Sequence, residues 1–178
     1  MKKTKTASAV IEPLGPHHDR AAFSCGNTGL DAYLEHRATQ DERRNVARVF
    51  VLVGDKPGAI AGFYSVSSTG IDIGDLPREQ AKKLPHYPVI PAALIGRLAV
   101  GREYQGQGLG GVLLVDALKR IIEAGGSVAA YAVVVDAKDD RAVSFYEKYG
   151  FQRFPTHPKR LFLPVATARR LFPQPISV

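Results

Sequence analysis

Cysteine is almost absent from this sequence of 178 residues, because Cys25 is the only one. A single thiol cannot form an internal disulfide, which fits a reducing compartment, and it leaves no thiol-based metal site. The sequence places no activating partner beside Cys25. We therefore expect it to pack as an ordinary small, buried side chain.

Long apolar runs are missing too, and none approaches the roughly 20 residues that a membrane-spanning helix needs. The basic start, residues 1–5, leads too soon to a charged residue to be a signal peptide. These absences indicate a cytoplasmic protein. Hydrophobic residues at 45% and charged residues at 23% predict one globular domain over residues 1–178, with residues 1–7 expected to be flexible.

Acidic residues are absent from residues 151–178, where Arg153, Lys159, Arg160, Arg169 and Arg170 supply five of the seven net positive charges. The first fifty residues supply the other two, with eight basic and six acidic side chains. Such an excess favours a polyanionic partner such as nucleic acid, although a solvated basic surface with no partner is the common alternative. Residues 165–178 are the end of this basic tail.

The distribution of β-branched and apolar residues between turn residues predicts the strands. They are expected at residues 8–14, 46–53, 59–69, 92–100, 128–135 and 160–164. The turn at residues 54–58 should join the second and third of these strands into an antiparallel hairpin.

Helix start and stop residues predict the helices. One helix should be capped by Asn27 or Thr28, and residues 40–44 either continue it or begin another. A short helix should start with Pro77 at its first position and end near residue 84, before an extended connection rich in proline. Residues 108–123 should form the next helix. The last helix should be capped by Asp139 or Asp140 and stopped by Gly150. The fold class is therefore mixed α/β (α+β), with an antiparallel front half and a βαβ-like back half.

A run of glycines lies between the strand that ends at Val100 and the helix that follows. It consists of Gln105, Gly106, Gln107, Gly108, Leu109, Gly110 and Gly111. Glycines allow the backbone to approach a ligand closely, and free N–H groups at a helix start favour a phosphate. A tight turn without a ligand is the simpler alternative.

Two other phosphate-binding loops are disfavoured. The run contains no Gly-Lys-Ser/Thr, which excludes a P-loop. Gly106, Gly108 and Gly111 do fit the dinucleotide pattern, and Asp136 stands at the end of the next strand. However, little chain remains after Asp136 for the further βα units of such a fold.

Two segments resemble the GNAT N-acetyltransferases. Residues 105–110 are similar to the family's Gln/Arg-x-x-Gly-x-Gly/Ala motif, after an apolar strand that reads Ile-Gly-Arg-Leu-Ala-Val. Residues 142–151, Ala-Val-Ser-Phe-Tyr-Glu-Lys-Tyr-Gly-Phe, are similar to its second motif. This resemblance implies a central, mostly antiparallel sheet with one splayed parallel strand pair, flanked by helices.

The GNAT resemblance also implies a cofactor and its contacts. Acetyl-CoA would be the donor, with no metal, and the N–H groups of residues 105–111 would hold its pyrophosphate. Backbone groups of Leu98, Ala99 and Val100 would bind pantetheine. Tyr146 would protonate the departing thiolate, unless it merely packs on the cofactor.

A narrower resemblance covers nearly the whole chain. Residues 23–26, 30–34, 40–44, 84–88, 95–100, 134–137, 154–155 and 160–164 are similar to the GNAT toxins of bacterial type II toxin–antitoxin modules. That resemblance implies acetylation of the α-amino group of aminoacyl-tRNA, which blocks translation. It also implies a ribbon-helix-helix antitoxin, operator DNA bound only by the toxin–antitoxin complex, and a homodimer.

The expected acceptor contacts are cationic. Arg97 stands on the strand that would line the cofactor cleft, where it could hold the 3′ end of the acceptor or form a structural ion pair. The other candidates for contact with tRNA phosphates are Arg43, Arg44, Lys82, Lys83, Arg153, Lys159, Arg160, Arg169 and Arg170. Neither Glu103 nor His86 is clearly placed as a general base, and an α-amino group hardly needs one.

Two alternatives remain open from the sequence. The chain could be a GNAT enzyme that acetylates a small-molecule or protein amine. It could also be a non-catalytic module that binds RNA.

Overall fold

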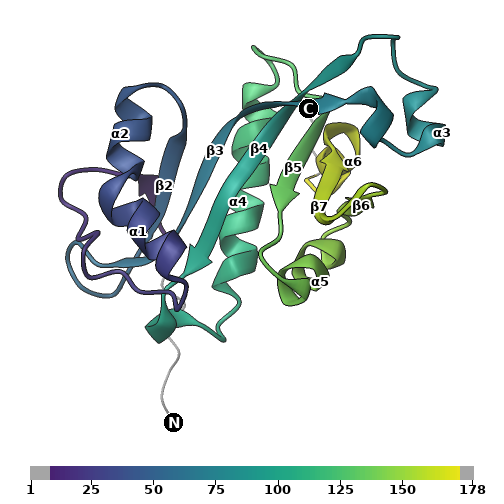
Figure 1. The fold of residues 1–178 in the computed structure, drawn as a ribbon. Helices are drawn as coiled ribbons and strands as arrows, with labels where there is room; N and C mark the ends of the chain where they lie inside the picture. Colours follow the sequence, from purple (N-terminus) through teal and green to yellow (C-terminus); the bar gives the residue numbers. More distant parts are fainter. Residues whose placement is uncertain (1–8, 173–178) are drawn as a thin grey trace, which may run out of the picture. The chain divides into compact units, whose positions relative to one another are not determined.

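The structure is a computed structural model that describes residues 9–172, in which seven strands form one sheet in the order β1-β2-β3-β4-β5-β7-β6 (Figure 1). The strands are β1 (Ile11–Pro13), β2 (Arg48–Val53), β3 (Ile60–Asp72), β4 (Val89–Val100), β5 (Ala132–Asp136), β6 (Gln152–Phe154) and β7 (His157–Pro164). The helices are α1 (Thr28–His36), α2 (Ala38–Arg43), α3 (Arg78–Ala81), α4 (Leu109–Ala124), α5 (Asp140–Lys148) and α6 (Val165–Arg170), with short 3-10 turns η1 (Ile73–Asp75) and η2 (Arg102–Tyr104). None of these helices is long and apolar enough to cross a membrane.

The chain divides into two compact units. The first comprises the residues up to Ser65 together with residues 97–116, and the second comprises residues 66–96 together with residues 117 onward. Strands β3 and β4 and helix α4 therefore contribute residues to both units. Residues 1–7, which were expected to be flexible, and the last six residues of the basic tail, 173–178, lie outside the described residues.

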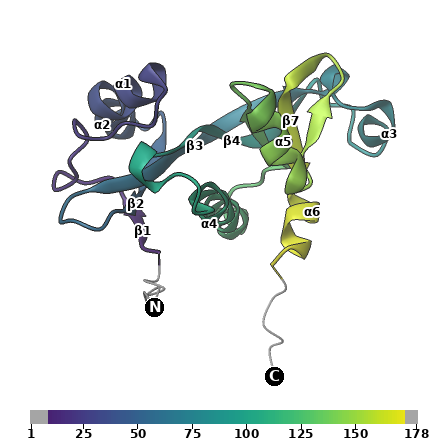
Figure 2. The ribbon, with the colours of Figure 1, turned by 90° about the horizontal axis from the view of Figure 1, so that it is seen from below.

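The first unit pairs β1 antiparallel with β2 and places α1 and α2 side by side next to β2 (Figures 1 and 2). Helix α1 begins where Asn27 accepts a hydrogen bond from the N–H of Leu30, as expected for an N-cap. The core between helices and strands contains Leu34, Val49 and Phe63, each fully buried. Cys25 joins this core as a buried thiol, which confirms the prediction for it.

The second unit contains the one parallel ladder, between β4 and β5 from Ala92–Ala132 to Ile95–Val135. Strand β7 pairs antiparallel with both β5 and β6. The apolar side chains of β5 are fully buried, as are Leu161, Phe162 and Leu163 of β7. The mixed fold class, the front hairpin and the βαβ-like back half are confirmed.

Several predicted strand boundaries are wrong. The strand expected at residues 128–135 begins only at Ala132, because the N–H of Val128 bonds to Ala124 and extends the turn that ends α4. Strand β4 begins earlier than expected, at Val89, and includes Pro91. Proline keeps an extended backbone, and the carbonyl of Pro91 still accepts a hydrogen bond from Tyr131.

Helix predictions need smaller corrections. Pro77 is the N-cap of α3 rather than its first residue, and the helix ends at Ala81. Residues 40–44 lie in and just beyond a separate helix, α2. Asp139 caps α5, and Gly150 follows it with a φ of +92°, which confirms the stop expected there. Strand β6 and helix α6 were not predicted, because β6 has only three residues and α6 only six.

Candidate active site

The glycine loop has a backbone that only glycine adopts without strain. Gly106 and Gly108 have φ values of +80° and +74°, and nothing lies within 4 Å of the position that a Cβ would take on either residue. Helix α4 follows at Leu109 and has no acidic residue in its first turn. The first N–H groups of a helix lack partners within it, so this helix start is open to an anion.

The loop is anchored at its start by Gln105. The side-chain amide nitrogen of Gln105 donates to the backbone carbonyls of Cys25 and Val100, both at 3.0 Å. The N–H of Gly101 donates to Ala61, and that of Arg102 donates to Ser24, each at 2.8 Å. The side chain of Gln105 therefore fixes the loop, and its backbone is the part that remains for a ligand.

A second anchor joins the loop to the turn between β2 and β3. The hydroxyl of Tyr104 donates to Oδ1 of Asp55 at 2.5 Å and also accepts the N–H of Asp55. This hydrogen bond lowers the pKa of Asp55 and raises that of Tyr104. The sequence offered no signal for the pair, because its members are far apart along the chain.

The end of β4 leads directly to this loop. Ala99 is buried in the core, whereas Leu98 and Val100 are half-buried. Because the side chain of Ala99 packs in the core, this residue can offer a ligand only its backbone. Strand β4 continues to Val100, beyond its last registered pair with β5 at Ile95.

Tyr146 lies on α5 in the second unit and is only 6% exposed. Its ring packs against Phe145 and Phe151, with ring centroids 5.1 and 5.5 Å away. Burial, and then the negative charge of Asp136, raise the pKa of Tyr146 to about 12. The hydroxyl is therefore protonated at neutral pH, as a proton donor must be, but it is a weaker acid than the ordinary tyrosine that the sequence led us to expect.

Arg97 is held by an aromatic ring. Its guanidinium carbon lies 3.6 Å from the ring centroid of Tyr33, a buried residue of α1. The hydroxyl of Tyr33 donates to Asp41 of α2 at 3.0 Å, and burial followed by this bond raises the pKa of Tyr33 to about 12. Among residues 9–172, Arg97 has no carboxylate partner, so the structural ion pair that was the alternative to an acceptor contact is not seen there.

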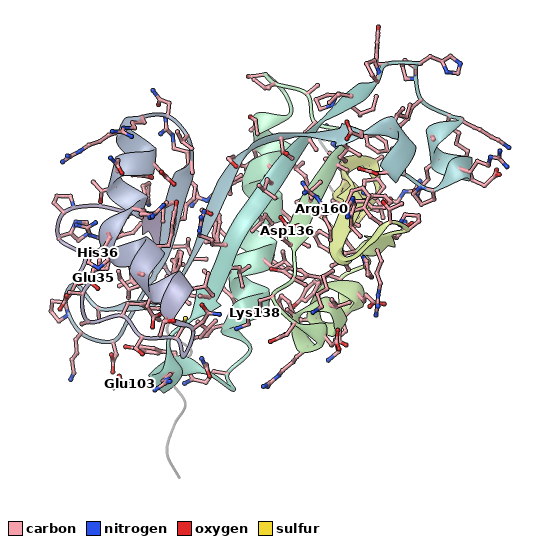
Figure 3. All side chains as sticks on the ribbon, in the orientation of Figure 1. Glu35, His36, Glu103, Asp136, Lys138 and Arg160 are labelled. Carbon is pink, nitrogen blue, oxygen red and sulfur yellow. The ribbon has the colours of Figure 1, made fainter. Side chains whose placement is uncertain are left out.

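The other basic candidates fall into two groups. Three have carboxylate partners: Arg153 donates twice to Glu147, Arg160 lies 3.8 Å from Asp136, and Lys82 lies 3.4 Å from Glu79. Figure 3 shows Asp136 and Arg160 on neighbouring strands. The candidates without an ion pair in the described part of the chain are Arg43, Arg44, Lys83, Lys159, Arg169 and Arg170.

The pairing of Asp136 with Arg160 also bears on the dinucleotide alternative. In that fold an acidic residue after the second strand binds a ribose, and the sheet is mostly parallel. Here the carboxylate of Asp136 faces an arginine, and only β4 and β5 are parallel. Both observations argue against a nicotinamide site.

Neither candidate base has a partner that would activate it. Glu103 is exposed on η2 (Figure 3). It lines a cavity of about 550 Å³ with Asp55, Arg102 and Tyr104. His86 is exposed in the connection before β4. No hydrogen bond joins either side chain to another part of residues 9–172.

One cluster has the residue types of a metal site. The ligand atoms of Glu12, His17 and His18 lie within 4.8 Å of one another. However, Nδ1 of His18 accepts the N–H of Gly15 at 2.9 Å, so Nε2 must carry the proton that it donates to Glu12 at 2.8 Å. Because a metal needs an unprotonated ring nitrogen, these contacts favour a hydrogen-bonded cluster without a metal.

Comparison with known proteins agrees with this geometry. The model of the acetyltransferase (GNAT) domain matches residues 88–160. The chain is 37% identical over 179 residues to the probable toxin TacT of Sinorhizobium fredii (strain NBRC 101917 / NGR234), covering 96% of this chain and 99% of the relative. It is also 37% identical over 153 residues to the tRNA-acetylating toxin of Mycobacterium tuberculosis (strain ATCC 25618 / H37Rv), covering 86% of this chain and 90% of that one.

Three solved structures show what similar proteins bind. AtaT in complex with acetyl-methionyl-tRNA is 28% identical, with a TM-score of 0.85 over 93% of this chain and 99% of that one. A tyrosine-to-phenylalanine mutant of AtaT bound to acetyl-CoA and the C-terminus of the antitoxin AtaR is 25% identical, with a TM-score of 0.79 over 93% and 99%. The AtaT–AtaR complex bound to DNA is 27% identical, with a TM-score of 0.73 over 92% and 99%.

Proposed function

This chain belongs to the GNAT acetyltransferase family, and on that premise we propose that it is a toxin that transfers acetyl from acetyl-CoA to the α-amino group of aminoacyl-tRNA. The observation that carries the proposal is the likeness to two toxins of 37% identity along nearly the whole chain. Acetylation would remove the nucleophile needed for peptide-bond formation and so block translation.

The donor would be held by residues of the glycine loop and of β4. We propose that the N–H groups of residues 105–111 bind the pyrophosphate and that backbone groups of Leu98, Ala99 and Val100 bind pantetheine. The open space at Gly106 and Gly108, and a helix start without an acidic residue, support this assignment. The anchors from Gln105 and Tyr104 would hold the loop in place before the cofactor binds.

The reaction needs no covalent enzyme intermediate. The neutral α-amine attacks the thioester carbonyl, a C–N bond forms, and the C–S bond breaks as CoA leaves. Tyr146 would donate its proton to the departing thiolate, and the attacking nitrogen, positively charged after C–N bond formation, would lose a proton to solvent to give the neutral amide, so that Tyr146 can be reprotonated from solvent. The pKa of about 12 keeps Tyr146 protonated for this step. Since a free α-amino group has a pKa of about 8, much of it is neutral at physiological pH without a general base.

The acceptor would be held by cations. We propose that Arg97, fixed on the ring of Tyr33, binds the phosphate nearest the 3′ end. Arg43, Arg44, Lys83 and Lys159, which lack ion pairs within residues 9–172, are stronger candidates for other phosphates than Lys82, Arg153 and Arg160, whose charges are already paired.

The same likeness supports proposals about partners and setting. We propose that the two compact units act as a single acetyltransferase domain and that the protein forms a homodimer in the cytoplasm. A ribbon-helix-helix antitoxin would neutralise it, and operator DNA would be bound by the toxin–antitoxin complex. Complexes of AtaT with an antitoxin and with DNA support this assignment.

Translation in vitro with acetyl-CoA labelled in its acetyl group tests the proposed function. We expect translation to stop and label to appear on charged tRNA, but not on uncharged tRNA or free amines. Label on a small amine or a protein, with translation intact, would instead indicate another GNAT acetyltransferase. Inhibition without any transfer of label would indicate a module that only binds RNA.

A further inference from the structure

The half-buried charge of Arg97 lies on β4, a strand in the middle of the sheet. Because side chains alternate along a strand, Arg97 is on the same face of β4 as Ala99, which packs in the core with Tyr33. Taking a charge out of water is costly unless another group compensates it. No carboxylate within residues 9–172 pairs with Arg97, so the compensation must come from elsewhere.

The ring of Tyr33 is the group that compensates this charge. The guanidinium carbon of Arg97 lies 3.6 Å from the ring centroid, and the negative face of an aromatic ring attracts a cation. The ring is held in place, because Tyr33 is only 4% exposed and stacks on Phe63, with 17° between the ring planes and 6.3 Å between the centroids. The contact uses the flat face of the guanidinium and leaves its N–H groups, at the edge, available to a ligand.

The hydroxyl of Tyr33 is bonded to a carboxylate on another helix. It donates to Oδ2 of Asp41, on α2, at 3.0 Å. Burial is the largest cause that raises the pKa of Tyr33 to about 12, Asp41 raises it further, and the charge of Arg97 lowers it. The phenol therefore feels an anion and a cation at once. A hydrogen bond to an anion also polarises the phenol and makes its ring face more negative, which strengthens the attraction for the guanidinium.

We propose that Asp41 is a positioning residue that acts through Tyr33, supplying the negative charge that Arg97 lacks while leaving the N–H groups of Arg97 free for the acceptor. A direct ion pair would also stabilise Arg97, but it would occupy those N–H groups. The proposal rests on the proposed function, in which Arg97 contacts the acceptor near its 3′ end. Asp41 is itself fixed, because its backbone carbonyl accepts the N–H of Val46 at 2.9 Å.

Steady-state acetylation of aminoacyl-tRNA by substituted proteins tests this proposal. Asp41→Asn keeps an oxygen for the hydroxyl of Tyr33 but removes the charge, and Tyr33→Phe keeps the ring but removes the hydroxyl. Each should raise KM for aminoacyl-tRNA by about threefold to tenfold, with kcat nearly unchanged, because each weakens one cation–π contact. Glu35→Gln is the matched control: it removes a carboxylate of α1 that faces His36 rather than Tyr33, and it should leave KM unchanged (Figure 3).

Coupling to Arg97 distinguishes positioning from a general effect on the fold. In an Arg97→Gln background, Asp41→Asn and Tyr33→Phe should no longer change KM, because the group that they position is missing. If Asp41→Asn raises KM by the same factor with and without Arg97, it acts on the packing of α1 and α2, and the proposal is wrong. The proposal is also wrong if Asp41→Asn matches the Glu35→Gln control. Unchanged Kd for acetyl-CoA would confirm that each variant is folded.

Urea unfolding separates the failure of this proposal from the failure of the proposed function. If the wild-type protein acetylates no aminoacyl-tRNA, the proposed function fails, and the link from Asp41 to Arg97 can still be measured. Asp41→Asn should then lower the folding equilibrium constant by a larger factor in the wild-type background than in the Arg97→Gln background. Equal factors in the two backgrounds would show that Asp41 and Arg97 are not coupled and would overturn the proposal.

Discussion

Some side chains in this protein make contacts that their sequence positions alone do not suggest. Gln105 belongs to the glycine loop, yet its side chain faces the backbone carbonyls of Cys25 and Val100 rather than open space. Arg97 lies on the ring of Tyr33 instead of in an ion pair. In both cases neighbours distant in sequence fix a polar group in one orientation. Groups that are already ordered lose less conformational entropy when a ligand binds.

Gln105→Glu tests the anchoring of the loop. The new carboxylate would face two carbonyl oxygens where an amide now donates, so we expect the folded state to lose about 1 kcal/mol and Tm to fall by roughly 2–4 °C. Thermal unfolding measures this change. Gln107→Glu makes the same charge change in the same loop at an exposed side chain, and equal Tm losses in the two variants would contradict the anchoring role of Gln105.

At the scale of elements, the junction between β4 and α4 forms the proposed donor site. The end of β4, the turn η2 and the start of α4 follow one another within a few residues, and two glycines with positive φ make the change of direction. The junction is held from outside by the Tyr104–Asp55 bond and by backbone bonds to β3 and to Ser24. A loop fixed in this way would present its N–H groups to the phosphate of the proposed donor without rearrangement.

Gly108→Ala should disturb this junction. A side chain at a φ of +74° costs about 1–2 kcal/mol, and relaxing that strain would turn N–H groups away from the ligand. We expect Kd for acetyl-CoA, measured by calorimetry, to rise about tenfold. Gly74→Ala is the control, because a Cβ there also meets nothing within 4 Å but the residue has no positive φ. An unchanged Kd in Gly108→Ala would show that the loop conformation does not matter for binding.

The elements also show which parts of the structure could be predicted. Long segments with clear periodicity and caps were predictable, such as α4 and the start of α5 at Asp139. Strand β6 and helix α6 were not, because segments so short carry no period and form only through tertiary pairing. The glycine loop and Tyr146 could be found from local sequence patterns. The Tyr104–Asp55 and Arg97–Tyr33 contacts could not, because they join distant segments and leave no local pattern.

At the scale of the whole molecule, charge and protonation tie stability to pH. The neutral form of Tyr146 is favoured in the folded protein, where its pKa is about 12, over the unfolded chain, where tyrosine has a pKa of about 10. This contribution is fully present below pH ~10 and is lost as the pH rises from there toward 12. Two units of pKa correspond to about 3 kcal/mol at most.

Urea unfolding at pH 8, 10 and 11 measures this contribution. The wild-type protein should lose stability above pH 10 more steeply than the Tyr146→Phe variant, which has no hydroxyl to ionise. Tyr33 should contribute in the same direction in both proteins, because its pKa is also raised to about 12. Parallel stability profiles for wild type and variant would show that the hydroxyl of Tyr146 is not buried.

Tyr146→Phe also separates binding from catalysis in the whole enzyme. Removing the proposed proton donor should lower kcat for acetyl transfer by about 10²–10⁴-fold, while Kd for acetyl-CoA stays the same because the ring is kept. Single-turnover kinetics and calorimetry measure the two quantities. Tyr149→Phe is the control, since Tyr149 lies just after α5 and has no proposed catalytic role. Equal rates for wild type and Tyr146→Phe would assign Tyr146 to packing.

The position of the transferred acetyl group tests the central claim most directly. Aminoacyl-tRNA would be incubated with the protein and acetyl-CoA labelled in its acetyl group, and the ester to the amino acid would then be cleaved with mild alkali. The proposed function predicts that all label leaves the RNA as an N-acetyl amino acid, identified by mass spectrometry. Label that stays on the RNA, or no label on aminoacyl-tRNA while a small amine is acetylated, would contradict it.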